Sequence, residues 1–265
     1  MGICLKNVSA AYHSRDAKEM ILKDLSFEIT EGKVIGILGE NGSGKSTLLR
    51  VLAGILTYSG NIEIDGVELS GIKRQELSQK ISFMTQFSNV YFSYTVWETV
   101  MLGRYLNLKK NKFLAGPSKE DIRKVEECLK MTGIEKIRDA ALDSLSGGQL
   151  QRVFLARTFA QDTAYILLDE PTNHLDLRYQ AQLVKDLRGW VDEKREGAER
   201  RNTIISVFHD INLAMQTADE FLVLKEGHIL AYAGKDELLH SDILKNAFGI
   251  DVRQYMGNQL KIWEG

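Results

Sequence analysis

The segment 39–46, GENGSGKS, constrains the fold of this chain more than any other part of its sequence. It fits the pattern G-x-x-x-x-G-K-[ST], and it stands between an apolar run at 34–38 and a helical pattern of leucines that begins at Leu48. Glycines in such a loop let successive backbone N–H groups point at phosphate oxygens, and the N-terminus of the following helix attracts the same anion. The sequence therefore predicts a strand, a phosphate-binding loop and a helix in succession. The residues predicted to bind the nucleotide phosphates are Gly39, Asn41, Gly42, Ser43, Gly44, Lys45, Ser46 and Thr47.

The chemistry expected at this loop is that of ATP with Mg²⁺. Lys45 supplies a positive charge toward the β- and γ-phosphates, and the Ser46 hydroxyl suits Mg²⁺. A magnesium nucleotide site also needs an acidic group at the end of a neighbouring buried strand, and the apolar run 165–168 ends in Asp169 and Glu170. We predict that Asp169 holds Mg²⁺, which prefers oxygen ligands, and that Glu170 accepts a proton from attacking water.

Strand and helix patterns alternate along most of the chain. Short apolar or β-branched runs at 81–84, 164–168 and 203–208 read as buried strands, and the runs 221–224 and 229–232 read as a pair joined across a turn. Strands separated by helices predict a mainly parallel sheet that helices cover. Between these strands, cap signals at Thr95 and Ser118 precede helical patterns, so a mostly helical block is expected to be inserted in the sheet.

Composition narrows the possible functions. With 34 Lys+Arg against 36 Asp+Glu, the net charge is −2, which gives no basis for binding nucleic acid through a basic surface. Cys4 and Cys128 cannot form a disulfide framework and are expected to be ordinary small apolar residues. No window approaches 18 uninterrupted apolar residues, so no membrane span is expected. The remaining histidines, which lack metal-ligand spacing, are His13, His174, His228 and His240.

Residues 145–149 have the sequence LSGGQ, the signature pentapeptide of the ATP-binding cassette (ABC) family of ATPases. The chain resembles this family. Gln86 stands where that family has its Q-loop glutamine, and 173–176 where it has its D-loop. His209 stands at the switch-histidine position, and Tyr12 where the family uses an aromatic residue to stack on adenine. The resemblance extends over nearly the whole chain.

The resemblance implies an α/β fold. Its core would be a P-loop NTPase (RecA-like) core with a mainly parallel sheet, joined by an antiparallel β subdomain and an inserted helical subdomain. The chain, 1–265, would be a single ABC ATPase domain. Residues 1–86 and 161–240 would form the core with the β subdomain, 87–160 the helical subdomain with the signature, and 241–265 a C-terminal extension.

The resemblance also implies roles for individual residues. Gln86 would contact Mg²⁺ or the lytic water, His209 would bond the γ-phosphate and orient Glu170, and Asp176 would organise a dimer interface. That dimer would be a head-to-tail homodimer, in which the signature of one subunit closes over the phosphate loop of the other. The signature residues that would bind nucleotide in this way are Ser146, Gly147, Gly148 and Gln149.

The chain departs from the commonest family pattern in two places. Leu150 follows the signature where many members have a polar or basic residue, which bears little on catalysis. Asn173 and His174 stand in the D-loop where many members have small residues, so no role is transferred to either of them.

The work that the ATPase drives is suggested by a second resemblance. Residues 94–105 look like the iron–siderophore, haem and cobalamin uptake group, which has a similar T-V-x-E…G-R pattern, although Leu106 and Asn107 replace its usual proline. The tail 247–252 resembles the same group, and both stretches can also be read as plain amphipathic helices. The resemblance implies a peripheral subunit at the cytoplasmic face of the membrane. Its partners would be separate membrane permease subunits and, indirectly, an extracytoplasmic substrate-binding protein.

Two other classes of ABC protein stay open at this point. A soluble assembly factor, of the kind that serves iron–sulfur cluster biogenesis, would have soluble partners instead of a permease. A nucleic-acid-associated ABC ATPase is disfavoured by the near-neutral charge, the single cassette and the lack of a coiled-coil insertion.

Overall fold

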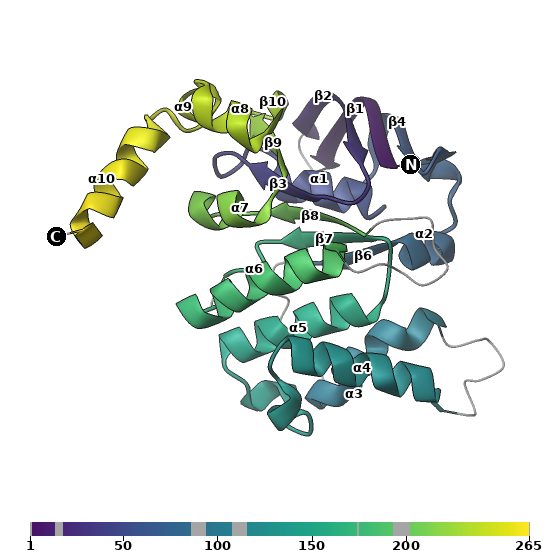
Figure 1. Cartoon of the computed structure of the whole chain (residues 1–265). Helices are drawn as coiled ribbons and strands as arrows, with labels where there is room; N and C mark the ends of the chain where they lie inside the picture. The colour runs from purple at the N-terminus through teal and green to yellow at the C-terminus, as the bar shows by residue number, and fades with distance from the viewer. Residues whose placement is uncertain are drawn as a thin grey trace.

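The computed structural model describes residues 2–13, 18–85, 94–107, 116–173, 175–192 and 202–264. Within these ranges the chain forms two sheets, with helices between them, on the outer face of the larger sheet and at the C-terminus (Figure 1). The α/β fold predicted from the sequence, with a mainly parallel sheet, an antiparallel sheet and an inserted group of helices, is confirmed.

The larger sheet has six strands in the order β10-β9-β3-β8-β7-β6. Every neighbouring pair is parallel except β10 and β9, which form a hairpin. Its strands are β3 (Val34–Leu38), β6 (Ile81–Met84), β7 (Tyr165–Asp169), β8 (Thr203–Val207), β9 (Glu220–Lys225) and β10 (His228–Gly234). All residues of β3, β7 and β8 are buried, which explains why their sequences are mainly apolar or β-branched, with Asp169 at the end of β7 and Ser206 in β8 as polar exceptions.

The smaller sheet is antiparallel, with four strands in the order β2-β1-β4-β5. Its strands are β1 (Gly2–His13), β2 (Lys18–Thr30), β4 (Tyr58–Ile64) and β5 (Val67–Glu68). The helix α1 (Lys45–Leu52) shares one apolar cluster with this sheet and with the face of the larger sheet that carries Ile37, Leu167 and Ile205. The phosphate-loop helix is therefore held between the two sheets.

The opposite face of the larger sheet, which carries Ile166 and Ile204, packs in a second cluster with most of the remaining helices. The helices of the inserted block and its surroundings are α2 (Arg74–Lys80), α3 (Val96–Met101), α4 (Lys119–Met131), α5 (Gly147–Ala160), α6 (Leu177–Asp192) and α7 (Ile211–Thr217). Capping boxes start three of them, at Thr95, Ser118 and Ser146. The sequence signals at Thr95 and Ser118 are thereby confirmed.

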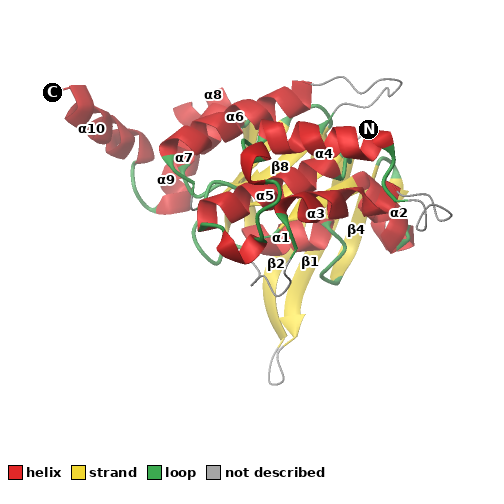
Figure 2. Ribbon diagram, turned by 90° about the horizontal axis from the view of Figure 1, so that it is seen from below, coloured by secondary structure: helices red, strands yellow, loops and turns green. Residues whose placement is uncertain are grey.

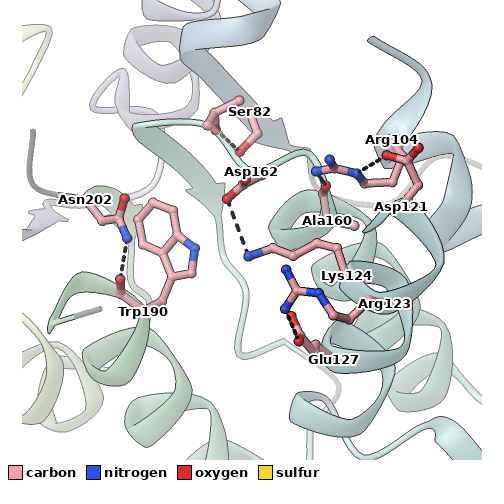
Figure 3. Close-up of polar contacts among 11 residues, drawn as sticks. Ser82, Arg104, Asp121, Arg123, Lys124, Glu127, Ala160, Asp162, Trp190 and Asn202 are labelled. Carbon is pink, nitrogen blue, oxygen red and sulfur yellow. Dashed lines mark hydrogen bonds and ion pairs between the residues drawn. The ribbon is translucent and has the colours of Figure 1, made fainter. Parts of the chain in front are cut away.

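The turns that link these helices include the short 3₁₀ segments η1 (Leu69–Gly71), η2 (Leu102–Asn107), η3 (Glu135–Ile137) and η4 (Leu142–Ser144). In η2, Arg104 is buried; its Nε donates to Asp121 Oδ1 on α4 at 3.0 Å and its Nη1 to the Ala160 carbonyl of α5 at 2.8 Å (Figure 3). The adjacent Gly103 lies so close to α5 that a Cβ would stand 2.3 Å from the Arg157 carbonyl oxygen. The Gly-Arg pair therefore fastens η2 to two helices.

The chain ends in α8 (Lys235–His240), α9 (Ile243–Phe248) and α10 (Val252–Glu264). The last of these projects from the body of the molecule in both views (Figures 1 and 2). Val252 at its start is buried, whereas Leu260 and Trp263 near its end are exposed. Within the residues that the structure describes, none of the helices combines the length and the apolar character that a membrane span requires.

Candidate nucleotide site

The segments that follow β3, β7 and β8 meet at one edge of the larger sheet, because these strands are parallel neighbours and their carboxyl ends point the same way. The phosphate loop follows β3, the pair Asp169-Glu170 closes β7, and His209 comes two residues after β8. Residues more than 100 positions apart in sequence are thus brought to one place.

The phosphate loop has a backbone that only glycine adopts easily. Gly39, Gly42 and Gly44 have φ of 145°, 82° and 103°. A Cβ on Gly39 would stand 2.2 Å from the Leu224 carbonyl oxygen and one on Gly44 2.6 Å from Leu22, whereas one on Gly42 would meet nothing within 4 Å. Two of the glycines are therefore required by the protein around them, and the third borders open space.

Lys45 is the first residue of α1 and is only 7% exposed. Its ammonium donates to the carbonyl oxygens of Gly39 and Glu40, each at 2.8 Å. Burial lowers the pKa of Lys45, although the charges of Glu170 and Asp169 oppose that effect. Among the described residues no carboxylate forms an ion pair with Lys45, so one of its three donors is left for a phosphate oxygen.

Two oxygen groups stand where a cation would be held beside the phosphates. The Ser46 hydroxyl donates to Asp169 Oδ1 at 2.8 Å, and Asp169 is 2% exposed. Burial raises the pKa of Asp169, while the hydrogen bond from Ser46 works in the opposite direction. Hydroxyl and carboxylate oxygens fit Mg²⁺, which takes few protein ligands beside phosphate and water. The described residues hold no cluster of three or more His, Cys, Asp or Glu side chains that could bind a metal ion by themselves.

A further buried polar atom points to a ligand at the loop. The Ser43 hydroxyl oxygen is buried and has no hydrogen-bond partner in the part of the chain that the structure describes. A buried hydroxyl without a partner costs free energy, and an anion in the loop would satisfy it. This atom therefore supports the phosphate-binding interpretation independently of the sequence pattern.

Glu170 lies against His209. The residue is 8% exposed, and its Oε1 lies 2.8 Å from His209 Nε2. Its other carboxylate oxygen, Oε2, accepts a hydrogen bond from Asn173 Nδ2 at 2.5 Å. Glu170 also has a φ of 55°, in the left-handed region that costs a non-glycine residue free energy. A carboxylate fixed in this way, beside the phosphate loop, can take a proton from water held against a phosphate.

Gln151 is a residue of the site that the sequence does not single out. Its side-chain Nε2 donates to the Glu170 and Pro171 carbonyl oxygens at 3.4 and 3.2 Å, and the residue is 3% exposed. The contact ties α5 to the turn that carries Glu170. Because both acceptors are backbone atoms, no side-chain pattern in the sequence predicts the contact.

Tyr12 lies on β1, 38% exposed, and its hydroxyl accepts a hydrogen bond from Arg50 Nη1 of α1 at 2.8 Å. The predicted adenine-stacking residue is thereby tied to the helix that follows the phosphate loop. Gln86, predicted to contact Mg²⁺ or the lytic water, lies outside the described residues, as does His174.

The signature is not brought to the phosphate loop of the same chain. Ser146 is the N-cap of α5: its hydroxyl accepts from the Gln149 N–H, and the Gln149 side chain accepts from the Ser146 N–H. The apolar residues of α5 belong to the cluster on one face of the larger sheet, and those of α1 to the cluster on the other face. Ser146 and Gly147 are exposed. The signature therefore faces outward, available to another chain.

Known proteins resemble this chain over most of its length. Residues 22–173 match the family model described as ABC transporter. The petrobactin import ATP-binding protein YclP of Bacillus subtilis is 33% identical, over 94% of this chain and 93% of its own length. The ferric enterobactin transport ATP-binding protein FepC of Escherichia coli is also 33% identical, over 88% of this chain and 83% of its own length.

Solved structures show the same architecture. The dimeric post-hydrolysis state of the ATP-binding cassette MJ0796, bound to ADP and Pi, superposes with a TM-score of 0.75 at 32% identity, covering 88% of this chain and 98% of that one. The protein cbiO1 from Clostridium perfringens, part of the ABC transporter complex cbiONQ, superposes with a TM-score of 0.73 at 28% identity over 98% of both chains.

Proposed function

The chain belongs to the ABC transporter family, and from that premise we propose that it is the ATP-hydrolysing subunit of an importer for iron–siderophore complexes. The observation that carries the catalytic part is the meeting of Lys45, Asp169 and the Glu170–His209 pair at one sheet edge. The transport part is supported by petrobactin and enterobactin proteins whose similarity extends over 88% or more of this chain.

In the proposed mechanism the residues act on a nucleotide laid along the phosphate loop. Tyr12, tied to Arg50, stacks on the adenine, and Lys45 with the loop N–H groups binds the phosphates. Ser46 and Asp169 would hold Mg²⁺, which would offset the negative charge of the phosphates.

The chemical step belongs to Glu170 and His209. Glu170 accepts the proton of the attacking water at its carboxylate, and His209 bonds the γ-phosphate and keeps the Glu170 carboxylate in place through the 2.8 Å contact. Gln86 completes the site in this proposal by contacting Mg²⁺ or the water. Because the base acts in the chemical step rather than in binding, its loss should lower turnover and leave nucleotide affinity intact.

The outward-facing signature is the reason to propose a head-to-tail homodimer. Ser146, Gly147, Gly148 and Gln149 start α5 with a helix N-terminus, which attracts anions, yet the apolar residues of α5 and those of the phosphate-loop helix α1 pack on opposite faces of the larger sheet. Closing the signature of one chain over the nucleotide of another gives both surfaces a ligand, and Asp176 would lie in that interface. Binding of ATP then favours the closed dimer, and hydrolysis reopens it.

We further propose that the subunit is peripheral at the cytoplasmic face of the membrane and passes this motion to separate permease subunits. An extracytoplasmic substrate-binding protein would deliver the iron complex to them. The soluble assembly factor is not favoured, because import and transport proteins are the relatives that match most of this chain. The net charge of −2 continues to disfavour a nucleic-acid-associated ATPase.

The test is uptake of radiolabelled ferric siderophores by cells in which the gene carries Glu170→Gln, with the tagged protein purified from their membranes. We expect uptake to fall to background while the variant still co-purifies with a polytopic membrane subunit. Unchanged uptake, or purification with soluble partners only, would contradict the proposal.

A further inference from the structure

Asn173 is the D-loop residue to which the sequence assigns no role, and the structure gives its side chain a definite partner. Its Nδ2 donates to Glu170 Oε2 at 2.5 Å. His209 lies on the other oxygen of the same carboxylate at 2.8 Å. The two carboxylate oxygens of Glu170 therefore have different partners, His209 in the segment after β8 and the side-chain amide of Asn173 in the D-loop.

The backbone of residues 170–173 turns Asn173 back toward Glu170. Residues 170–173 form a turn in which the Asn173 N–H donates to the Glu170 carbonyl at 3.3 Å, with Pro171 at the second position, where its fixed φ is favoured. Gln151 of α5 bonds the Glu170 and Pro171 carbonyls from the opposite side. The turn is thus held by the backbone and by Gln151, without any contribution from the side-chain amide of Asn173.

Contacts at both carboxylate oxygens of Glu170 restrain the group more than a contact at one oxygen does. The terminal torsion of a glutamate side chain is a broad, weakly restricted rotation, so a contact at Oε1 restrains the plane of the carboxylate less than contacts at both oxygens do. The Asn173 donor at Oε2 fixes the plane of the group. Catalysis requires that the base be held within about 0.5 Å and 10–20° of its productive geometry.

We propose that Asn173 is a positioning residue, whose side-chain amide holds the plane of the Glu170 carboxylate for proton transfer. The inference rests on the proposed role of Glu170 as the base. Many members of the family have a small residue at this position, so the device would be a feature of this chain and of those that share its asparagine.

The experiment compares Asn173→Asp and Asn173→Ser in steady-state ATP hydrolysis. Aspartate keeps the shape of the side chain, removes the donor and sets a second carboxylate against Glu170, whereas serine is too short to bond Oε2. We expect kcat to fall about 10-fold in Asn173→Ser and about 100-fold in Asn173→Asp, with the KM for ATP changed less than about twofold.

Asn61 on β4 supplies a matched control, because its Nδ2 donates to Glu63 Oε1 at 2.9 Å, the same amide–carboxylate contact outside the site. Asn61→Asp should leave kcat unchanged. Thermal unfolding of all variants separates a loss of rate from a loss of folded protein, and Asn173→Ser keeps the test valid if Asn173→Asp folds poorly.

A double-mutant cycle with Glu170→Gln tests whether Asn173 acts through Glu170. We expect Asn173→Ser to change the residual single-turnover rate of Glu170→Gln less than about twofold, because the carboxylate that it positions is already gone. An equal fold-loss in both backgrounds, a raised KM with normal kcat, or a wild-type kcat in both Asn173 variants would overturn the inference. A wild-type kcat in Glu170→Gln would instead overturn the assignment of the base itself.

Discussion

Two glycine–cation pairs lie inside this protein, Gly44-Lys45 in the phosphate loop and Gly103-Arg104 in η2, and both cations are buried to a similar degree, 7% and 6% exposed. Arg104 donates to a carboxylate, that of Asp121, and to the Ala160 carbonyl. Lys45 donates to loop carbonyls alone among the described residues. Arg104 is thus paired with a carboxylate, whereas Lys45 forms no ion pair within the described residues.

This difference separates a structural motif from a binding site. Burial lowers the pKa of Lys45, so the fold holds that charge at a cost that a bound anion can offset. The Gly-Arg pattern, which in the sequence resembles the uptake group, here fastens η2 to α4 and α5. A buried glycine–cation pair that matches a family pattern therefore indicates a ligand site only when the cation lacks a carboxylate partner in the protein.

The largest expected effect is that of Lys45→Met, which removes the charge and keeps an unbranched side chain. We expect kcat for ATP to fall at least about 100-fold, because a charge that stabilises the transferred phosphoryl group is lost. Unfolding without nucleotide should be unchanged or shifted to higher temperature, since an unpaired buried charge is removed. A marked loss of stability would show that Lys45 serves the fold as Arg104 does.

Arg104→Ala should lower stability and spare the ATPase rate, the reverse of the result expected for Lys45→Met. Removing one partner of a buried ion pair leaves Asp121 without its cation, so the free energy of unfolding should fall by about 3–5 kcal/mol. Denaturant unfolding measures the loss, and the ATPase rate of each folded molecule should stay near that of the wild type. Arg104→Lys should rescue stability only in part, because an ammonium cannot match the two directions of the guanidinium.

The buried carboxylates of Asp121 and Asp169 should also differ in their contribution to stability. Burial favours a raised pKa at Asp121, but hydrogen bonds from Ser118 and Arg104 outweigh it and hold the pKa below its ordinary value. At pH 7 Asp121→Asn should lower the free energy of unfolding by about 1–3 kcal/mol. Asp169→Asn should leave it unchanged or raise it by up to about 1 kcal/mol, because the pKa of Asp169 is raised by burial and its ionised form is disfavoured.

The sign of the pH dependence follows from the lowered pKa of Asp121. Its ionised form stabilises the folded state above about pH 4, and this contribution is lost as the pH falls further. The free energy of unfolding of Asp121→Asn should therefore fall less steeply than that of the wild type between about pH 4 and pH 3. Parallel curves would show that Asp121 is not held by these contacts.

Two glycine substitutions extend the comparison to the backbone. Gly103→Ala sets a Cβ 2.3 Å from a backbone carbonyl and should cost about 1–3 kcal/mol of stability with little change in KM. Gly42→Ala meets no neighbour within 4 Å and should cost only the strain of its left-handed φ, about 1 kcal/mol. If nucleotide fills the space beside Gly42, the KM for ATP should rise in that variant as well.

Much of the fold could be predicted because its signals are local. The strands β3 and β6 were predicted with the bounds that they have, since each is a short apolar run, and the caps at Thr95 and Ser118 lie within four residues of their partners. The phosphate loop is likewise one continuous segment. These elements need no knowledge of distant contacts.

The contacts that the sequence does not indicate depend on distant residues, on backbone atoms or on local turn geometry. Arg50 reaches Tyr12 across 38 positions, and Gln151 bonds only carbonyl groups. Asn173 bonds Glu170 three residues back, where Glu170 has a left-handed φ. Residue type and spacing carry no signal for contacts of this kind.

The central claim is that two chains complete each other's nucleotide site, and the molar mass of Glu170→Gln in solution tests it most directly. With Mg-ATP, light scattering should give twice the 29.9 kDa of one chain, and adding Ser146→Arg should return the mass to that of a monomer. Adding Ser118→Arg, which removes the same kind of helix cap from α4, should leave the dimer intact. A Glu170→Gln variant that stays monomeric with Mg-ATP, or that dimerises equally well with Ser146→Arg, would contradict the account.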